Sequence, residues 1–193
     1  MMNRTELNNH AREFKKYLST FYETSKSKPD DKLSVVKYCI SESIRIEAID
    51  FDAVQRDWYK VKHASGEKAP CSVDAMYFTE GKIYAVEFKS GINVDSVNLV
   101  RKIYDTVMAL IEKDRQDIAT CRSKVEYIVV AEQSKSNQEI VTTRAAVYRS
   151  RPWEVHIWDR WKLYNLEKVV VSRTYVIPPD LFLRFAKSKH WVT

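Results

Sequence analysis

The sequence predicts an α/β fold in which a central mixed β-sheet is flanked by helices on both faces. Three observations support this class. Two short apolar segments, residues 72–78 and 82–89, are separated by a three-residue turn; a long helical pattern begins at residue 95; and another apolar segment spans residues 127–131. A hairpin followed by a helical crossover produces both antiparallel and parallel pairing. The chain has 193 residues and three glycines, without an internal repeat, which indicates a single domain.

The segments before the hairpin are expected to be mostly helical. Apolar residues recur at helical spacing over residues 5–24, which predicts a first helix. A second helix is expected to begin near Asp31 or Ser34 and to end near Ile49. A short strand is expected over residues 57–62.

The hairpin and the elements after it carry clearer signals. Thr79-Glu80-Gly81 has the length and the glycine of a hairpin connection. The helix that follows has Asp95 or Ser96 as a candidate N-cap. Further strands are expected at residues 127–131, 154–158 and 168–178, and a helical or irregular C-terminal tail is expected after them.

Positive charge is concentrated in the last quarter of the chain. The net charge is +6, and residues 141–193 contain ten basic and four acidic residues, so residues 1–140 are neutral. Basic and aromatic residues together suit a polyanion with stackable bases. The alternative is a solvated basic face whose aromatic residues lie in the core. The aromatic residues interleaved with this charge are Trp153, Trp158, Trp161, Tyr164, Tyr175 and Trp191.

The composition also indicates where in the cell the protein is expected. The sequence has no apolar run near the roughly 18 residues of a membrane span, so no membrane partner is expected. Its N-terminal segment has no apolar signal-peptide core. Cys39, Cys71 and Cys121 show no metal-site spacing and are expected to be free thiols, which favours a cytoplasmic location.

One predicted strand ends in an acid and a base. Because side chains alternate along a strand, Glu87 and Lys89 share one face, and the opposite face is wholly apolar. The hairpin can bring Asp74, a lone acid on the neighbouring strand, beside Glu87. Two carboxylates there repel unless a cation lies between them, and hard oxygen ligands suit Mg²⁺ or Mn²⁺. The alternative is a surface ion pair at a strand end, with Asp74 capping a turn.

These residues resemble a known signature. SVDAMYF, which contains Asp74, and VEFKSG, which contains Glu87 and Lys89, are similar to the bipartite motif of the PD-(D/E)xK nuclease superfamily. In that motif an acid on one strand precedes Glu-x-Lys on the next. The order of elements over roughly residues 34–160 also resembles the superfamily's αβββαβ core, and IYAVEFKSG with LVRKIYDTVMAL is similar to bacterial members. Val73 stands where many members have proline.

The resemblance implies a restriction-endonuclease-like core at residues 34–160, with an N-terminal helical extension at 1–30 and a basic C-terminal extension at 161–193. It implies a Mg²⁺- or Mn²⁺-dependent endo- or exonuclease that hydrolyses phosphodiester bonds, with DNA favoured over RNA. A homodimer is compatible with it, because many such nucleases pair two active sites.

The expected catalytic residues are Asp74, Glu87 and Lys89. Asp74 and Glu87 are the expected metal ligands. A metal held there would polarise the scissile phosphate and activate a bound water. Lys89 could position that water or stabilise the transition state.

The superfamily often adds an acid from the helix before the sheet, and two candidates exist. On a helical wheel of residues 35–49, at about 100° per residue, Glu42 lies about 40° from the centre of the apolar stripe and Glu47 about 100° away. An inward-facing acid needs a partner, so Glu42 is the expected additional metal ligand and Glu47 the reserve. The simpler interpretation of either is a rim carboxylate without a metal role.

Other residues carry weaker signals. Arg101, Lys102 and Tyr104 follow Lys89 in the first turns of the helix and are candidate phosphate contacts, although most helical lysines and arginines are simply solvated. The four histidines show no catalytic spacing. Two alternatives to cleavage remain: a non-catalytic nucleic-acid- or protein-binding module on the same fold, and an unrelated α/β domain.

Overall fold

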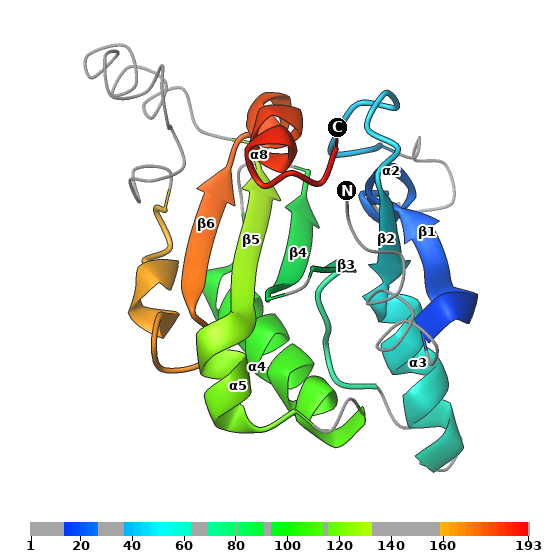
Figure 1. Cartoon of the computed structure of the whole chain (residues 1–193), viewed down its shortest axis with the longest axis vertical. Helices are drawn as coiled ribbons and strands as arrows, with labels where there is room; N and C mark the ends of the chain where they lie inside the picture. The colour runs from blue at the N-terminus through cyan, green and yellow to red at the C-terminus, as the bar shows by residue number, and fades with distance from the viewer. Residues whose placement is uncertain are drawn as a thin grey trace.

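The structure is a computed structural model that describes residues 14–26, 37–62, 69–79, 81–90, 94–113, 116–132 and 159–192. These residues form a six-stranded sheet whose spatial order follows the sequence (Figure 1). The strands are β1 (Leu18–Thr20), β2 (Glu47–Asp50), β3 (Ala75–Phe78), β4 (Ile83–Lys89), β5 (Val125–Ala131) and β6 (Arg173–Ile177).

The sheet is mixed, as predicted. Strands β1 to β4 pair antiparallel in succession, whereas β5 pairs parallel with β4 and β6 pairs parallel with β5. Parallel neighbours need a crossover, and α4 and α5 supply the one between β4 and β5. The edge strands β1 and β6 come from the segments expected to be extensions, so both contribute to one sheet.

Helices cover both faces of this sheet. One apolar core includes residues of α3, α4 and α5, and a second includes residues of α2 and α8 on the opposite face. The α/β class with a helix-flanked mixed sheet is therefore confirmed. The helices are η1 (Lys15–Tyr17), α2 (Phe21–Thr24), α3 (Phe51–Lys62), α4 (Ser96–Lys113), α5 (Ile118–Lys124), η2 (Leu163–Leu166), η3 (Pro179–Leu181) and α8 (Phe182–Ser188).

The predicted hairpin forms between β3 and β4. Ala75 lies opposite Val86, and the Thr79 amide donates to the Lys82 carbonyl over 2.9 Å at the turn. The predicted alternation of faces also holds, because Ala85 packs in the α4 core and Val86 in the opposite one. Glu87 therefore points to the face that α4 covers.

The long helix begins where the sequence indicates. Asp95 Oδ1 accepts a hydrogen bond from the Val97 amide over 2.9 Å, as an N-cap side chain does. The buried side of α4 repeats at helical spacing through Leu99, Ile103 and Leu110. Val97, in the first turn, is 71% exposed.

The helix expected to end near Ile49 is wrong over its described part. Residues 37–46 form no helix there, and β2 follows at 47–50. Ile44, Ile46 and Ala48 are buried while Arg45 and Glu47 are exposed, which is the two-residue period of an extended chain. The β-branched isoleucines favour that conformation.

The strand expected over residues 57–62 is also wrong, because those residues belong to α3. Phe51, Val54 and Gln55 are buried at helical spacing. Asp50 Oδ1 accepts from the Ala53 amide over 2.8 Å, which is the N-cap interaction that begins this helix.

The first helix was expected over residues 5–24, and its described part is divided. A 3₁₀ turn precedes β1, and α2 starts only at Phe21, where Thr20 Oγ1 accepts from the Glu23 amide over 3.2 Å. Phe14 and Phe21 lie in the two different cores. A single helix could not reach both faces of the sheet, whereas an edge strand between the two residues can.

The C-terminal part confirms one expected strand, β6, within residues 168–178. The strand expected at 154–158 lies outside the described residues, as do Trp153 and Trp158. Tyr175 and Trp191 are buried, whereas Tyr164 is 42% exposed, so the described aromatic residues contribute largely to the core. Among the described residues, no helix has the length and apolar character needed to cross a membrane.

Candidate active site

Asp74 lies directly before β3 and is fixed by two neighbouring elements. Its Oδ2 accepts a hydrogen bond from the Phe88 amide of β4 over 2.7 Å, and its carbonyl accepts from the Phe51 amide of α3 over 3.2 Å. The preceding residue is tied to α4, because the Val73 amide donates to Thr106 Oγ1 over 3.0 Å. The carboxylate is thus held at the carboxyl end of β4.

Glu87 points from β4 into the same place and meets two lysines. Lys89 Nζ lies 2.6 Å from Glu87 Oε1. Lys102 Nζ, from α4, lies 2.7 Å and 2.9 Å from the two Glu87 oxygens and 3.3 Å from Asp74 Oδ1. The structure therefore brings Asp74, Glu87 and Lys89 together, as predicted, and adds Lys102 between the two acids.

The four residues form a shielded ionic cluster. The Glu87 side chain is 0% exposed, whereas those of Lys102, Asp74 and Lys89 are 16%, 18% and 27% exposed. Burial and the neighbouring Glu87 charge raise the pKa of Asp74 to about 8, although Lys102 opposes the shift. Burial acts to lower the pKa of Lys102, but the charges of Asp74 and Glu87 outweigh it and raise that pKa above its ordinary value.

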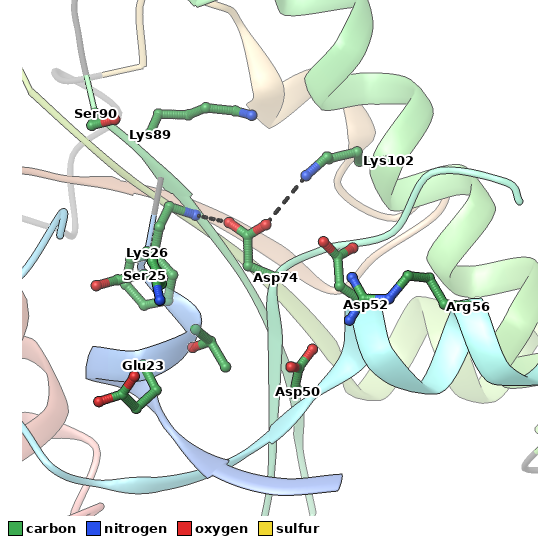
Figure 2. A pocket seen from close by; sticks show the side chains of 12 residues that line it. Glu23, Ser25, Lys26, Asp50, Asp52, Arg56, Asp74, Lys89, Ser90 and Lys102 are labelled. Carbon is green, nitrogen blue, oxygen red and sulfur yellow. Dashed lines mark hydrogen bonds and ion pairs between the residues drawn. The ribbon is translucent and has the colours of Figure 1, made fainter. Parts of the chain in front are cut away.

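This cluster borders a pocket of about 470 Å³. Figure 2 shows the Asp74 carboxylate between β4 and the Lys102 ammonium, with Asp50, Asp52 and Arg56 along the α3 side. Glu87 lies behind this surface and contacts the pocket through the two lysines. The lining residues are Glu23, Thr24, Ser25, Lys26, Asp50, Asp52, Arg56, Asp74, Phe88, Lys89, Ser90 and Lys102.

Residues of α2, of α3 and at the end of β2 also line the pocket, and they were not predicted from the sequence. Asp50, Asp52 and Arg56 line the pocket because α3 starts beside Asp74. A signal was present, since Asp50 precedes a helical pattern and an aspartate is a common N-cap. The contribution of Lys26 depends on the pairing of β1 with β2, for which the local sequence offers no comparable signal.

The acids proposed from the preceding helix lie elsewhere. The Glu42 side chain is 68% exposed and pairs with Arg45, and it does not line the pocket. Glu47 is an exposed residue at the start of β2 and does not line it either. The helical wheel that favoured Glu42 has no basis here, because the described residues around it form no helix.

Of the weaker candidates, only Lys102 reaches the site. Arg101 Nε lies 3.7 Å from Asp105, and its guanidinium donates to Cys71 Sγ over 2.9 Å. Tyr104 is 44% exposed on the outer side of α4. His190 is exposed, and the other histidines, His10, His63 and His156, lie outside the described residues.

Two carboxylates are the metal donors that this cluster offers. Within the described ranges, no group of three His, Cys, Asp or Glu residues has a metal-binding arrangement. Mg²⁺ commonly keeps several waters and binds one or two carboxylates together with substrate phosphate oxygens. The pair formed by Asp74 and Glu87 at the pocket fits that hard-oxygen chemistry, which Mn²⁺ shares.

No family model matches the chain, and it has no match among curated proteins or solved structures. The fold and the site define an α/β protein with a carboxylate–lysine cluster at a pocket.

Proposed function

We propose that this protein is a Mg²⁺- or Mn²⁺-dependent nuclease that hydrolyses phosphodiester bonds, with DNA as the favoured polymer. The supporting observation is the convergence of Asp74, Glu87 and Lys89 at one pocket, from a hairpin whose residues resemble the PD-(D/E)xK motif. Carboxylates that can hold a metal ion, beside an ammonium that faces the pocket, are groups that metal-assisted phosphodiester hydrolysis can use.

Asp74 and Glu87 would hold the metal ion, which when bound polarises the scissile phosphate and lowers the pKa of a water molecule. The Phe88 amide fixes the Asp74 carboxylate, so this ligand is oriented before substrate arrives. Lys89 is fixed by Glu87 at one side and lines the pocket at the other. Its ammonium would hold the attacking water or stabilise negative charge on the phosphate.

Other cations of the pocket support a polyanionic substrate. Lys26 lines it from the chain beyond α2, Arg56 from α3 and Lys102 from α4. Positively charged side chains around a carboxylate pair would contact phosphates that flank the scissile bond.

Cleavage assays with matched variants test this proposal. Supercoiled plasmid, linear single-stranded DNA and RNA would each be incubated with Mg²⁺, with Mn²⁺ and with excess EDTA. We expect metal-dependent cleavage of DNA by the wild type and a large loss in Asp74→Asn and Lys89→Ala. Asp117→Asn is the control, because Asp117 caps α5 outside the pocket and asparagine caps a helix equally well.

The results separate the alternatives. If Asp74→Asn and Lys89→Ala cleave as fast as the wild type, the assigned site is wrong. If the wild type cleaves none of the three polymers but retains DNA in a gel-shift assay, the chain is a non-catalytic nucleic-acid-binding module on this fold.

A further inference from the structure

The ammonium of Lys102 lies at the point that two carboxylates share. It contacts both Glu87 oxygens at 2.7 Å and 2.9 Å and Asp74 Oδ1 at 3.3 Å. A cation bridging two carboxylates in this way occupies the position that a divalent metal would take between them. Because like charges repel strongly at contact distance in a shielded site, Lys102 and a metal ion cannot both remain there.

Lys89 differs from Lys102 in this respect. Its Nζ contacts Glu87 Oε1 at 2.6 Å, and Glu87 is its only carboxylate partner among the described residues. Lys89 therefore does not occupy the point that the two carboxylates share, although it contacts the same Glu87 oxygen, Oε1, as Lys102. The competition with metal concerns Lys102.

The Lys102 ammonium can also reach a partner inside the pocket. Its side chain lines the pocket, and four flexible carbons connect the ammonium to α4. When it leaves the carboxylates, the ammonium remains anchored at the pocket wall, where a phosphate group would be its natural partner. A phosphate in the pocket would in turn draw the ammonium away from the acids.

We propose that Lys102 is an internal counter-ion that couples the two ligands of the site. It blocks the metal position between Asp74 and Glu87, and it yields that position when it binds a substrate phosphate. Metal and phosphate then bind cooperatively, and each raises the affinity of the other by the same factor. This inference rests on the proposed function, because it concerns the same carboxylate pair.

Calorimetric titration of the full chain with Mn²⁺ tests the coupling without any cleavage. Each titration would be run alone, with thymidine 5′-monophosphate and with thymidine, which lacks the phosphate. For the wild type we expect weak Mn²⁺ binding that the monophosphate strengthens at least fivefold and thymidine leaves unchanged. For Lys102→Met we expect Mn²⁺ to bind at least tenfold more tightly, with the monophosphate effect reduced below twofold.

Two control variants separate a vacated position from a general change of charge. Lys89→Met removes an ammonium from Glu87 but leaves Lys102 in place, so the monophosphate effect should persist. Lys82→Met removes an ammonium from another buried glutamate, Glu126, and should bind Mn²⁺ like the wild type. Where Lys102→Met does not fold, as judged by circular dichroism, Lys102→Gln keeps hydrogen-bond donors at the acids and must show the same loss of coupling.

Different results would overturn the Lys102 inference and the nuclease proposal. Equal Mn²⁺ affinity and equal monophosphate coupling in the wild type and the Lys102 variants would overturn this inference and leave the nuclease proposal standing. If Mn²⁺ binds neither the wild type nor the variants, both proposals fail.

Discussion

Two buried glutamates on adjacent strands, Glu87 on β4 and Glu126 on β5, are each held by two lysines, yet their surroundings differ. At Glu126, Lys82 Nζ and Lys189 Nζ lie 3.3 Å and 3.1 Å from the two carboxylate oxygens. One acid is there shared by two ammonium groups. At the Glu87 cluster, two acids share the Lys102 ammonium, and Lys89 contacts Glu87 alone.

The two clusters also differ in what surrounds them. Lys189 Nζ lies 4.6 Å from the ring centre of Tyr175 and 5.4 Å from that of Phe185, and it donates to the Tyr175 hydroxyl over 2.8 Å. These contacts fasten the end of α8 to the sheet. The Glu87 cluster borders a pocket instead. We infer that a buried ion pair indicates function when two acids share one cation at the border of a cavity.

The largest expected contrast is in catalysis. Glu87→Gln should reduce the rate of plasmid cleavage about 100-fold or more, because a neutral amide cannot hold a cation as the carboxylate does. Glu126→Gln should change the rate less than twofold, because Glu126 lies outside the pocket. Cleavage rates with Mn²⁺ at equal protein concentration measure both, and a similar loss in the two variants would remove the distinction between the clusters.

The next contrast is in stability. Lys102→Met should lower the free energy of unfolding by about 2 kcal/mol, because it leaves two shielded acids without their shared cation. Lys82→Met should cost about 1 kcal/mol or less, because Lys82 is 37% exposed and solvent screens its pair. Urea unfolding of both variants at neutral pH measures these values, and a larger cost for Lys82→Met would contradict the assignment.

The pH dependence of stability should depend on Asp74. Its pKa is about 8 in the folded protein and about 4 in an unfolded chain. Between these values the folded state binds the extra proton, so this carboxyl stabilises the fold fully below pH 4 and loses that contribution as the pH rises to 8. The free-energy difference between the wild type and Asp74→Asn should therefore fall between pH 5 and 8 and level off above. A constant difference in urea unfolding across this range would refute the shift.

The smallest effect concerns the Glu126 cluster. Tyr175→Phe removes the hydroxyl that accepts from Lys189 and should cost about 1 kcal/mol of stability. Cleavage should stay at the wild-type rate. Thermal unfolding together with a plasmid assay checks both, and a lost activity would show that the two clusters are coupled.

The sequence predicted the part of the site that a single hairpin determines. Alternation along β4 put Glu87 and Lys89 on one face, and a short turn brought Asp74 beside them. The sequence indicated the role of Lys102 only in part. It was named as a phosphate contact, but its spacing of three residues from Leu99 and four from Thr106 places it on the buried side of α4.

The rest of the fold was harder to predict from the sequence, because one segment carries both a helical and an extended pattern. The many apolar residues at 35–49 suggested a helix, while the alternation of Ile44, Ile46 and Ala48 indicated the extended chain that forms. Lys26 and Arg56 lie 30 residues apart in the sequence and join one pocket through pairing across β1, β2 and β3. Such long-range pairing leaves little trace in either segment.

The position of Trp191 in the core affects how the chain folds during translation. Its ring centre lies 5.4 Å from that of Phe21, and it also packs on Tyr77 and Tyr84. These partners leave the ribosome long before Trp191 is synthesised. Until then, a nascent chain would present part of an uncovered aromatic surface, which makes it a target for chaperones during translation.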